Sequence, residues 1–197
     1  WKREIELMSL LRNRLNMNIN IIERPIVENV LKNILEVNPV LFRGEPLILA
    51  EEQKETVLKA INSPLLIVTG GPGTGKTSVA LTILRVHRML GLAERPAIVA
   101  PTGRAANRLS ESLVNGLKTI EDLCKLKHDF ELLKYSANAK TIHRLLGYHP
   151  DRNSFSHHEY DPLEHDLLII DEGSMIDQSL MVCLLRASNS KLPYILP

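Results

Sequence analysis

The sequence contains few cysteines and no long apolar run. Its 2 cysteines, Cys124 and Cys183, form no Cys-x-x-Cys motif, which argues against a disulfide framework and fits a reducing cytosol. No apolar stretch of the sequence approaches the roughly 18 residues of a membrane-spanning helix, and no secretory signal is visible. We therefore expect a cytoplasmic chain with no membrane partner.

An excess of one charge is also absent. The chain has 24 Lys and Arg against 23 Asp and Glu, which gives a net charge of +1 at pH 7. This balance excludes a polycation that binds nucleic acid through its overall charge. If the chain binds nucleic acid, a local groove must do so.

The hydrophobic content is high enough for a folded core. Hydrophobic residues make up 44% of the 197 residues, which suffices for one substantial α/β domain. The chain begins with Trp1 and stops within the apolar run 192–197, so we expect a piece of a longer protein.

The amino-terminal part predicts helices without catalytic residues. Residues 1–17 place Ile5, Met8, Leu11 and Leu15 at helical spacing, which predicts an amphipathic packing helix. A second helix is expected to open at Pro25 and to run to about Val37. The turn sequence at 43–46 sets the expected boundary between this helical arm, 1–45, and a nucleotide-binding domain, 46–197.

The most informative stretch is GGPGTGKT at residues 70–77, which fits the phosphate-loop pattern G-x-x-x-x-G-K-[ST]. Glycines let the backbone turn so that consecutive N–H groups face a phosphate. Lys76 can reach the β- and γ-phosphates of a nucleotide, and the Thr77 hydroxyl can bind Mg²⁺. The expected cofactors are ATP and Mg²⁺, held by the residues Gly70, Gly71, Pro72, Gly73, Thr74, Gly75, Lys76, Thr77 and Ser78.

The sequence around the loop supports this interpretation. Residues 65–69 form a short apolar run typical of a strand, and residues 78–84 continue with helix-compatible spacing. The order of strand, glycine-rich loop and helix is the context in which the pattern binds phosphate.

A second acidic site follows a strongly apolar run. Residues 167–170 read Leu-Leu-Ile-Ile, which is typical of a strand buried on both faces of a parallel sheet. Asp171 is expected to hold Mg²⁺ through its waters, and Glu172 to orient and deprotonate the attacking water. Asp177 is expected to cap a helix over 178–187.

Two further segments have the features of a ligand-binding edge. After the expected strand 97–100, a Thr-Gly turn leads into a helix that begins with small residues, where a phosphodiester can approach. Arg104 and Arg108 share a face of that helix, although charge alone favours a solvated face. Thr141 is expected to cap a short helix that Gly147 ends, with His143 and Arg144 in its first turn.

Two other polar features are ambiguous. Gln53, on a helix expected over 50–61, has the donor and acceptor that recognition of adenine requires, but its residue type alone favours a surface position. The histidines of segment 143–165 form no H-x-x-x-H pair on a clear helix, and no cysteine lies near them. Their spacing does not favour a metal site.

Four motifs in fixed order resemble one family. GGPGTGKTS, VAPTGRAANRLSE, TIHRLLGY and LLIIDEGSMID resemble the helicase motifs of RecD-type enzymes of superfamily one, the α subunits of bacterial exodeoxyribonuclease V. The resemblance extends from about Gln53 to Asp177. It implies a RecA-like, three-layer α/β fold with a mainly parallel sheet, in the first of two motor domains, with a further domain before the helical arm.

The resemblance also implies roles for particular residues. Gln53 would contact adenine, and single-stranded DNA would lie along Pro101, Thr102, Gly103, Arg104, Thr141, His143 and Arg144. The implied activity is ATP-dependent 5′-to-3′ translocation on DNA, within an exodeoxyribonuclease V complex that processes double-strand breaks. Gly173 replaces the alanine that is usual in the DEAS motif, which loosens the backbone beside Glu172.

Other functions remain open from the sequence. The helicase part of a conjugative relaxase and a standalone RecD-like helicase would differ outside this chain. A nucleotide-dependent switch that binds a protein partner belongs to another class, and the TIHRLLG and PTGRAA motifs argue against it.

Overall fold

The computed structural model describes residues 2–42, 44–71, 73–188 and 194–196. Their centre is a sheet of 5 parallel strands in the order β3-β9-β8-β4-β5. The strands are β3 (Leu65–Ile67), β4 (Pro96–Ala100), β5 (Lys140–Thr141), β8 (Leu167–Ile170) and β9 (Tyr194–Leu196). This confirms the expected α/β fold with a parallel sheet.

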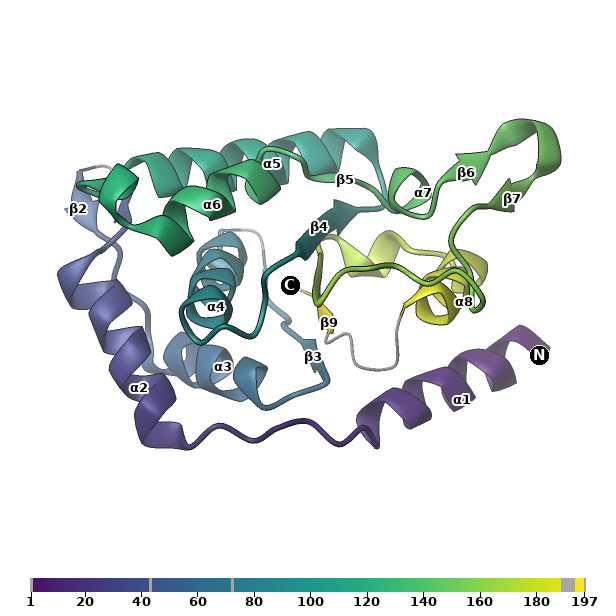
Figure 1. Ribbon diagram of the computed structural model, residues 1–197, viewed down its shortest axis with the longest axis horizontal. Coiled ribbons are helices and arrows are strands. Elements are labelled where there is room, and N and C mark those ends of the chain that lie inside the picture. The colour runs from purple at the N-terminus through teal and green to yellow at the C-terminus, as the bar shows by residue number, and fades with distance from the viewer. Residues whose placement is uncertain (1, 43, 72, 189–193, 197) are drawn as a thin grey trace.

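Helices cover both faces of the sheet (Figure 1). The helices are α1 (Lys2–Leu15), α2 (Arg24–Lys32), α3 (Glu51–Ile61), α4 (Lys76–Met89), α5 (Gly103–Lys118), α6 (Lys127–Ser136), α7 (Ile142–Leu145) and α8 (Gln178–Ala187). Two small antiparallel hairpins lie outside the sheet, β1 (Leu41–Phe42) with β2 (Glu45–Pro46) and β6 (Tyr148–His149) with β7 (Ser154–Phe155).

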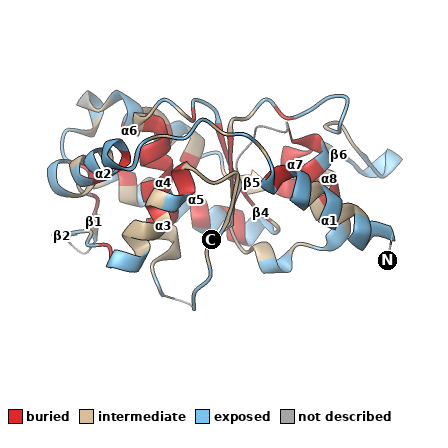
Figure 2. Cartoon of the chain, turned by 90° about the horizontal axis from the view of Figure 1, so that it is seen from below, coloured by how far each residue is buried: buried red, intermediate tan, exposed pale blue. Residues whose placement is uncertain are grey.

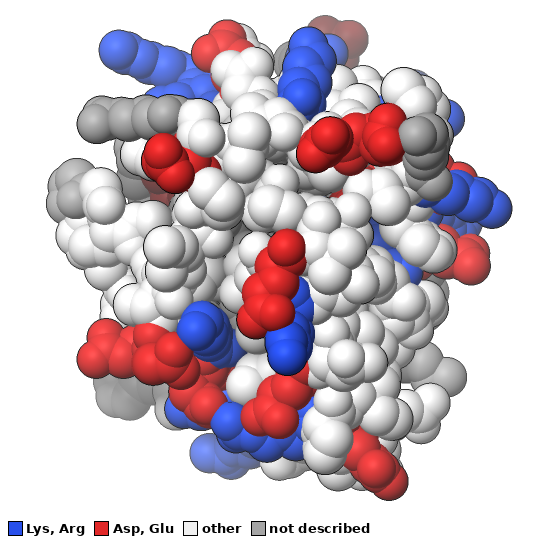
Figure 3. Space-filling model, turned by 90° about the vertical axis from the view of Figure 1, so that its left-hand side faces the viewer, with Lys and Arg blue, Asp and Glu red and all other residues white. Residues whose placement is uncertain are grey.

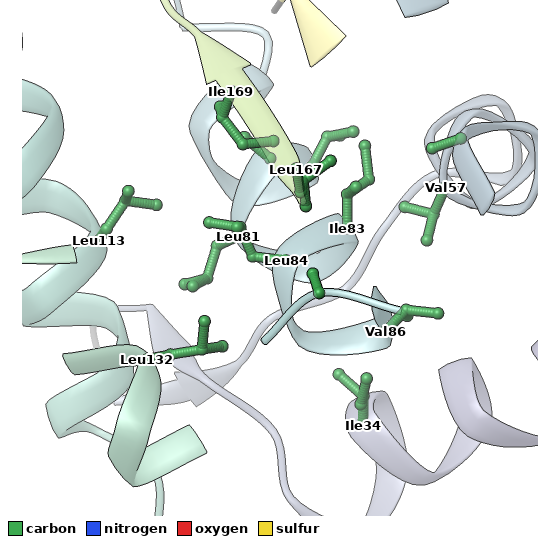
Figure 4. Close-up of a cluster of buried hydrophobic side chains, with 14 of the residues drawn as sticks. Ile34, Val57, Leu81, Ile83, Leu84, Val86, Leu113, Leu132, Leu167 and Ile169 are labelled. Atoms are coloured by element: carbon green, nitrogen blue, oxygen red, sulfur yellow. The ribbon is translucent and has the colours of Figure 1, made fainter. Parts of the chain in front are cut away.

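The strands β4 and β8 are buried along their whole length, as their continuous apolar sequences predict. Their side chains alternate between two hydrophobic clusters. Ile98, Leu167 and Ile169 pack against α4 and its neighbours, whereas Val99 and Ile170 pack against α7 and α8. Figure 2 shows the buried residues concentrated between the helical layers, and Figure 4 shows the first cluster around α4.

Helix α1 packs on α8 with a face that matches the expected one only in part. Ile5 and Met8 are 58% and 62% exposed, and Leu15 is also exposed. Leu11 packs against the cluster that includes α8, as expected, and Leu7 and Leu10 join it in place of the other three. Both sets have helical spacing, so periodicity alone cannot decide between them; the position of α8 selects the second.

The second helix of the arm ends in a wider turn. Helix α2 continues as a π-helical turn over Asn33–Val37, so together they span the expected range. Beside this turn lies a buried ion pair between Arg85 of α4 and Asp129 of α6. Arg85 donates to both Asp129 oxygens at 2.8 Å and to the carbonyl of Asn38 at 2.8 Å. The pair therefore ties α4, α6 and the end of the π-helical turn together.

A buried histidine lies on the same helix as Arg85. His87 donates through Nδ1 to the carbonyl of Ile83 at 2.9 Å. Burial lowers the pKa of His87 to about 4, so its ring is neutral at pH 7. It is a packing residue of α4.

The outer surface agrees with the balanced charge of the sequence. On the side formed by α2, α3 and α6, acidic and basic side chains lie interspersed among uncharged ones (Figure 3). None of the helices in the described part of the chain combines the length and apolar character needed to cross a membrane.

Candidate nucleotide and DNA site

The candidate residues follow the ends of neighbouring strands. Because all strands of the sheet are parallel, the segments that follow β3, β4, β5 and β8 emerge at one edge. This carboxyl edge is where open α/β sheets bind ligands. The phosphate-loop segment, the acidic pair and the two segments that are expected to contact DNA, which follow β4 and β5, all begin there.

The phosphate loop leads directly into α4. The helix begins at Lys76, and its N-cap, Gly75, has a left-handed φ of 80° and provides no side-chain cap. The first N–H groups of α4 and its helix dipole therefore face the loop without a capping side chain. This is the arrangement that binds a phosphate at a helix N-terminus. Pro72, expected in this loop, lies outside the described residues.

Glycine is required at two positions of the loop. A Cβ at Gly75 would lie 2.9 Å from Nε2 of Gln53, in addition to the positive φ. A Cβ at Gly70 would lie 2.6 Å from Oγ1 of Thr74. The loop is thus packed closely enough that side chains at these positions would displace its walls.

In this structure Lys76 bends back over the loop. Its Nζ donates to the carbonyls of Gly70 at 2.8 Å and Gly71 at 3.1 Å. A phosphate bound in the loop would offer the ammonium a charged acceptor in place of these neutral ones, and charge-assisted hydrogen bonds are the stronger kind. The amine is therefore already beside the position where its predicted ligand would bind.

We predict that Lys76→Ala weakens ATP binding. Hydrogen bonds to charged groups contribute about 1.5–3 kcal/mol, which corresponds to a loss of affinity of about ten- to a hundredfold. Titration calorimetry of the two proteins measures this difference. Lys118→Ala, at the exposed carboxyl end of α5, is the matched control and should bind as the wild type does. Equal affinities for the Lys76 variant and the wild type would contradict the assignment of the loop.

Gln53 contacts the phosphate loop directly. Its Oε1 accepts from the N–H of Ala50 at 2.9 Å, and its Nε2 donates to the carbonyl of Thr74 at 2.9 Å. These bonds join the start of α3 to the loop. Contact with adenine remains a prediction for this residue, and it would require Gln53 to exchange or share these partners.

The acidic pair lies at the end of the buried strand β8. The N–H of Asp171 donates to the carbonyl of Val99 at 2.9 Å, which fixes the residue beside β4. Asp171 Oδ1 accepts from the N–H of Glu172 at 3.0 Å. Glu172 has a left-handed φ of 53°, a costly conformation for a residue with a side chain. The chain turns sharply here, and a 3₁₀ turn over Gly173–Met175 follows.

The predicted Mg²⁺ ligands are suited to the ion. The Thr77 hydroxyl and the Asp171 carboxylate are oxygen donors, which Mg²⁺ prefers. No other described residue forms a hydrogen bond with the Thr77 side chain, so its oxygen is available. In phosphoryl transfer the bound ion neutralises charge on the phosphates.

The structure reveals a partner of Glu172 that the sequence did not indicate. Arg108 of α5 forms an ion pair with Glu172, with 2.5 Å between Nη2 and Oε1. The only sequence feature that drew attention to Arg108 is its position on the same helix face as Arg104, and charge alone predicts that this face is solvated. A contact between residues so far apart in sequence has no local pattern.

The two segments that are expected to contact DNA begin side by side. In the sheet, Ala100 of β4 pairs with Thr141 of β5, so the residues after both strands leave the sheet together. Thr102 caps α5 by accepting from the N–H of Ala105 at 3.2 Å, and small buried alanines follow. Pro101 precedes the cap, Gly103 and Arg104 are the first residues of α5, and Arg104 is exposed.

The cap predicted at Thr141 is confirmed. Its Oγ1 accepts from the N–H of Arg144 at 3.2 Å, and the side chains of His143 and Arg144 are exposed. The ring of His143 lies 5.4 Å from that of Tyr148 and 5.9 Å from that of Phe155, both in the hairpin β6–β7. An exposed imidazole beside two aromatic rings, together with the exposed side chain of Arg144, makes a surface that suits bases and phosphates.

Comparison with known proteins agrees with this geometry. A family model described as an AAA domain matches residues 53–196. The RecBCD enzyme subunit RecD of Haemophilus influenzae is 39% identical over 137 residues, which cover 68% of this chain and 21% of the relative. The RecBCD enzyme subunit RecD of Mycolicibacterium smegmatis is 39% identical over 143 residues, covering 70% of this chain and 25% of the relative.

A third similar protein has a different name. The ATP-dependent RecD2 DNA helicase of Deinococcus radiodurans is 37% identical over 139 residues, covering 71% of this chain and 16% of the relative. The matched part of this chain thus spans a quarter or less of each of these three relatives.

Proposed function

The chain belongs to the AAA domain family, and from this premise we propose that it is the ATP-binding motor domain of a RecD-type DNA helicase. The observation that carries the proposal is the common sheet edge. A phosphate loop, an acidic pair after a buried strand and two adjacent segments suited to a DNA strand all begin there. A nucleotide and a DNA strand that bind at the same edge of the sheet can influence each other.

The proposed reaction is hydrolysis of ATP. The loop and the amino terminus of α4 bind the phosphates, and Lys76 neutralises charge on the β- and γ-phosphates. Thr77 and Asp171 would hold Mg²⁺. Glu172 accepts a proton from the attacking water, as a general base does. Lys76 and Glu172 are therefore the proposed catalytic residues, and Gln53 the proposed adenine contact.

The proposed second ligand is single-stranded DNA. Its backbone would cross the starts of α5 and α7, over Thr102, Gly103 and Arg104 on one side and Thr141, His143 and Arg144 on the other. From the resemblance of its four motifs to those of RecD-type helicases, we propose 5′-to-3′ movement on DNA. The names of two relatives as subunits of a RecBCD enzyme support an exodeoxyribonuclease V complex that contains further subunits. Double-strand break repair would be the setting of that activity.

The test of this function is the ATPase of the full-length protein with and without oligo(dT). We expect single-stranded DNA to stimulate turnover. We also expect Arg104→Ala and Arg144→Ala each to lower the slope of log affinity against log salt by about one unit, because each removes one phosphate contact. Binding measured by fluorescence anisotropy across a salt series gives these slopes.

Arg95→Ala is the control for the salt series, because Arg95 precedes β4 at the opposite edge of the sheet and pairs with the exposed Glu164. Its slope should equal that of the wild type. Turnover that ignores single-stranded DNA would favour the nucleotide-dependent protein switch. Unchanged slopes in both arginine variants would remove the DNA path proposed here.

A further inference from the structure

The ion pair between Arg108 and Glu172 joins the two proposed ligand sites. Arg108 lies on α5, the helix whose start would contact DNA, and Glu172 is the proposed general base for ATP hydrolysis. The side chain of Arg108 is 71% exposed, whereas that of Glu172 is 28% exposed. One partner of the pair is therefore accessible to a ligand from solvent, while the other is more buried and follows β8 at the same sheet edge as the phosphate loop.

The pair has little value as a stabilising contact. Exposed ion pairs contribute at most about 1 kcal/mol and often nothing, because solvent and salt screen them. The backbone of Glu172 nevertheless adopts a left-handed conformation, with a φ of 53°. Strained residues of this kind are concentrated at functional sites. The arrangement therefore calls for an explanation other than stability.

The pair also affects what Glu172 can do. An oxygen engaged by a guanidinium is oriented by it and has one lone pair fewer to offer to water. Among the described residues, Arg108 is the group that engages the carboxylate of Glu172. In this conformation the proposed base is directed toward α5.

Arg108 is well placed to change partners. It follows Arg104 by one helical turn on the same exposed face of α5. A DNA backbone that contacts Arg104 would bring a neighbouring phosphate within reach of this flexible, exposed guanidinium. A guanidinium group binds the oxygens of a phosphate as readily as it binds those of a carboxylate. The phosphate would compete with Glu172 for the same donor.

We propose that Arg108 is a positioning residue that withholds Glu172 from its catalytic orientation until DNA occupies the start of α5. This inference rests on the proposed function and explains how DNA would stimulate it. Once Arg108 has turned to a phosphate, Glu172 takes the proton of the attacking water. The water oxygen then forms a bond to the γ-phosphorus, and the bond from that phosphorus to the bridging β-phosphate oxygen breaks, which leaves ADP and phosphate.

The experiment compares the full-length wild type with Arg108→Gln. In the absence of DNA, kcat should rise about two- to fivefold, the factor that corresponds to an exposed ion pair of up to about 1 kcal/mol. KM for ATP should not change, because Arg108 does not contact the phosphate loop. With saturating oligo(dT), kcat should equal that of the wild type, so the stimulation factor falls in proportion.

Two further variants separate this effect from a general structural one. Arg108→Lys keeps the positive charge and should retain part of the restraint on Glu172. Its kcat without DNA should therefore lie between that of the wild type and that of Arg108→Gln. Arg95→Gln breaks an exposed ion pair at the opposite sheet edge and should leave both rates unchanged. Thermal melting of each protein checks that it folds.

A fall of kcat in Arg108→Gln, with and without DNA, would overturn the proposal, because Arg108 would then hold Glu172 in a productive position. Equal DNA-free rates in Arg108→Gln and wild type would overturn it too.

Failure of the proposed function gives a different result from failure of this inference. In that case DNA does not stimulate even the wild type, whereas the inference alone fails when the wild type is stimulated and the DNA-free rate of Arg108→Gln does not rise.

Discussion

Glu172→Gln is expected to bind ATP as the wild type does and to lose DNA-stimulated turnover by at least about a hundredfold, the usual contribution of general acid–base catalysis. The amide keeps the size and shape of the carboxylate, so the phosphate loop and Asp171 are undisturbed. It cannot take up the proton of the attacking water at neutral pH. The measurements are calorimetric ATP binding and steady-state ATPase with saturating oligo(dT).

The control for this variant is Glu164→Gln. Glu164 is a highly exposed acid whose partner is Arg95, and the same change there should leave turnover intact. The amide also weakens the ion pair with Arg108, and this loss of restraint by itself would raise turnover. The rise would be about fivefold or less, which is small beside the hundredfold fall caused by loss of the general base. Turnover close to that of the wild type would place the general base on another residue.

Asp129→Ala is expected to lower the free energy of unfolding by about 3–5 kcal/mol, the usual result of removing one partner of a buried ion pair. The side chains of Arg85 and Asp129 are only 2% and 5% exposed. Without Asp129, the Arg85 guanidinium keeps its bond to the carbonyl of Asn38 but has no counter-charge. Urea denaturation gives the change in free energy.

Two comparisons make this prediction specific. Asp161→Ala removes a surface acid that is 66% exposed, and we expect a change below about 1 kcal/mol. Arg85→Met combined with Asp129→Leu removes both charges, so the double variant should be more stable than Asp129→Ala. A loss below about 1 kcal/mol for Asp129→Ala would show that water or another acid compensates Arg85.

Local features of the chain were predictable because their causes are local. The apolar runs before the phosphate loop and before Asp171 form β3 and β8, since their residue types favour strands; β8 is buried along its length, whereas β3 is only partly buried. The cap at Asp177 accepts from the N–H groups of Ser179 and Leu180, and α8 spans the expected range. Such caps depend on residues within one turn of each other.

Two other features were not predictable. The prediction of the face that α1 buries was right for Leu11 but wrong for Ile5, Met8 and Leu15, because two overlapping apolar stripes satisfy the same helical period. No pattern in the sequence identified a role for helix α6, which precedes the TIHRLLG motif and supplies Asp129 to the core. Both outcomes depend on which element packs opposite, and periodicity contains no information about that neighbour.

The sequence by itself determined the phosphate loop, the acidic pair, the two segments of the proposed DNA path and the class of fold, because each is carried by residues adjacent in the chain. Only the tertiary structure decided that β9 lies between β3 and β8, that Gln53 bonds to the loop, and that Arg108 reaches Glu172. These contacts join residues from different elements. Their free energy comes from packing the whole sheet and its helices together, and no stretch of sequence encodes it alone.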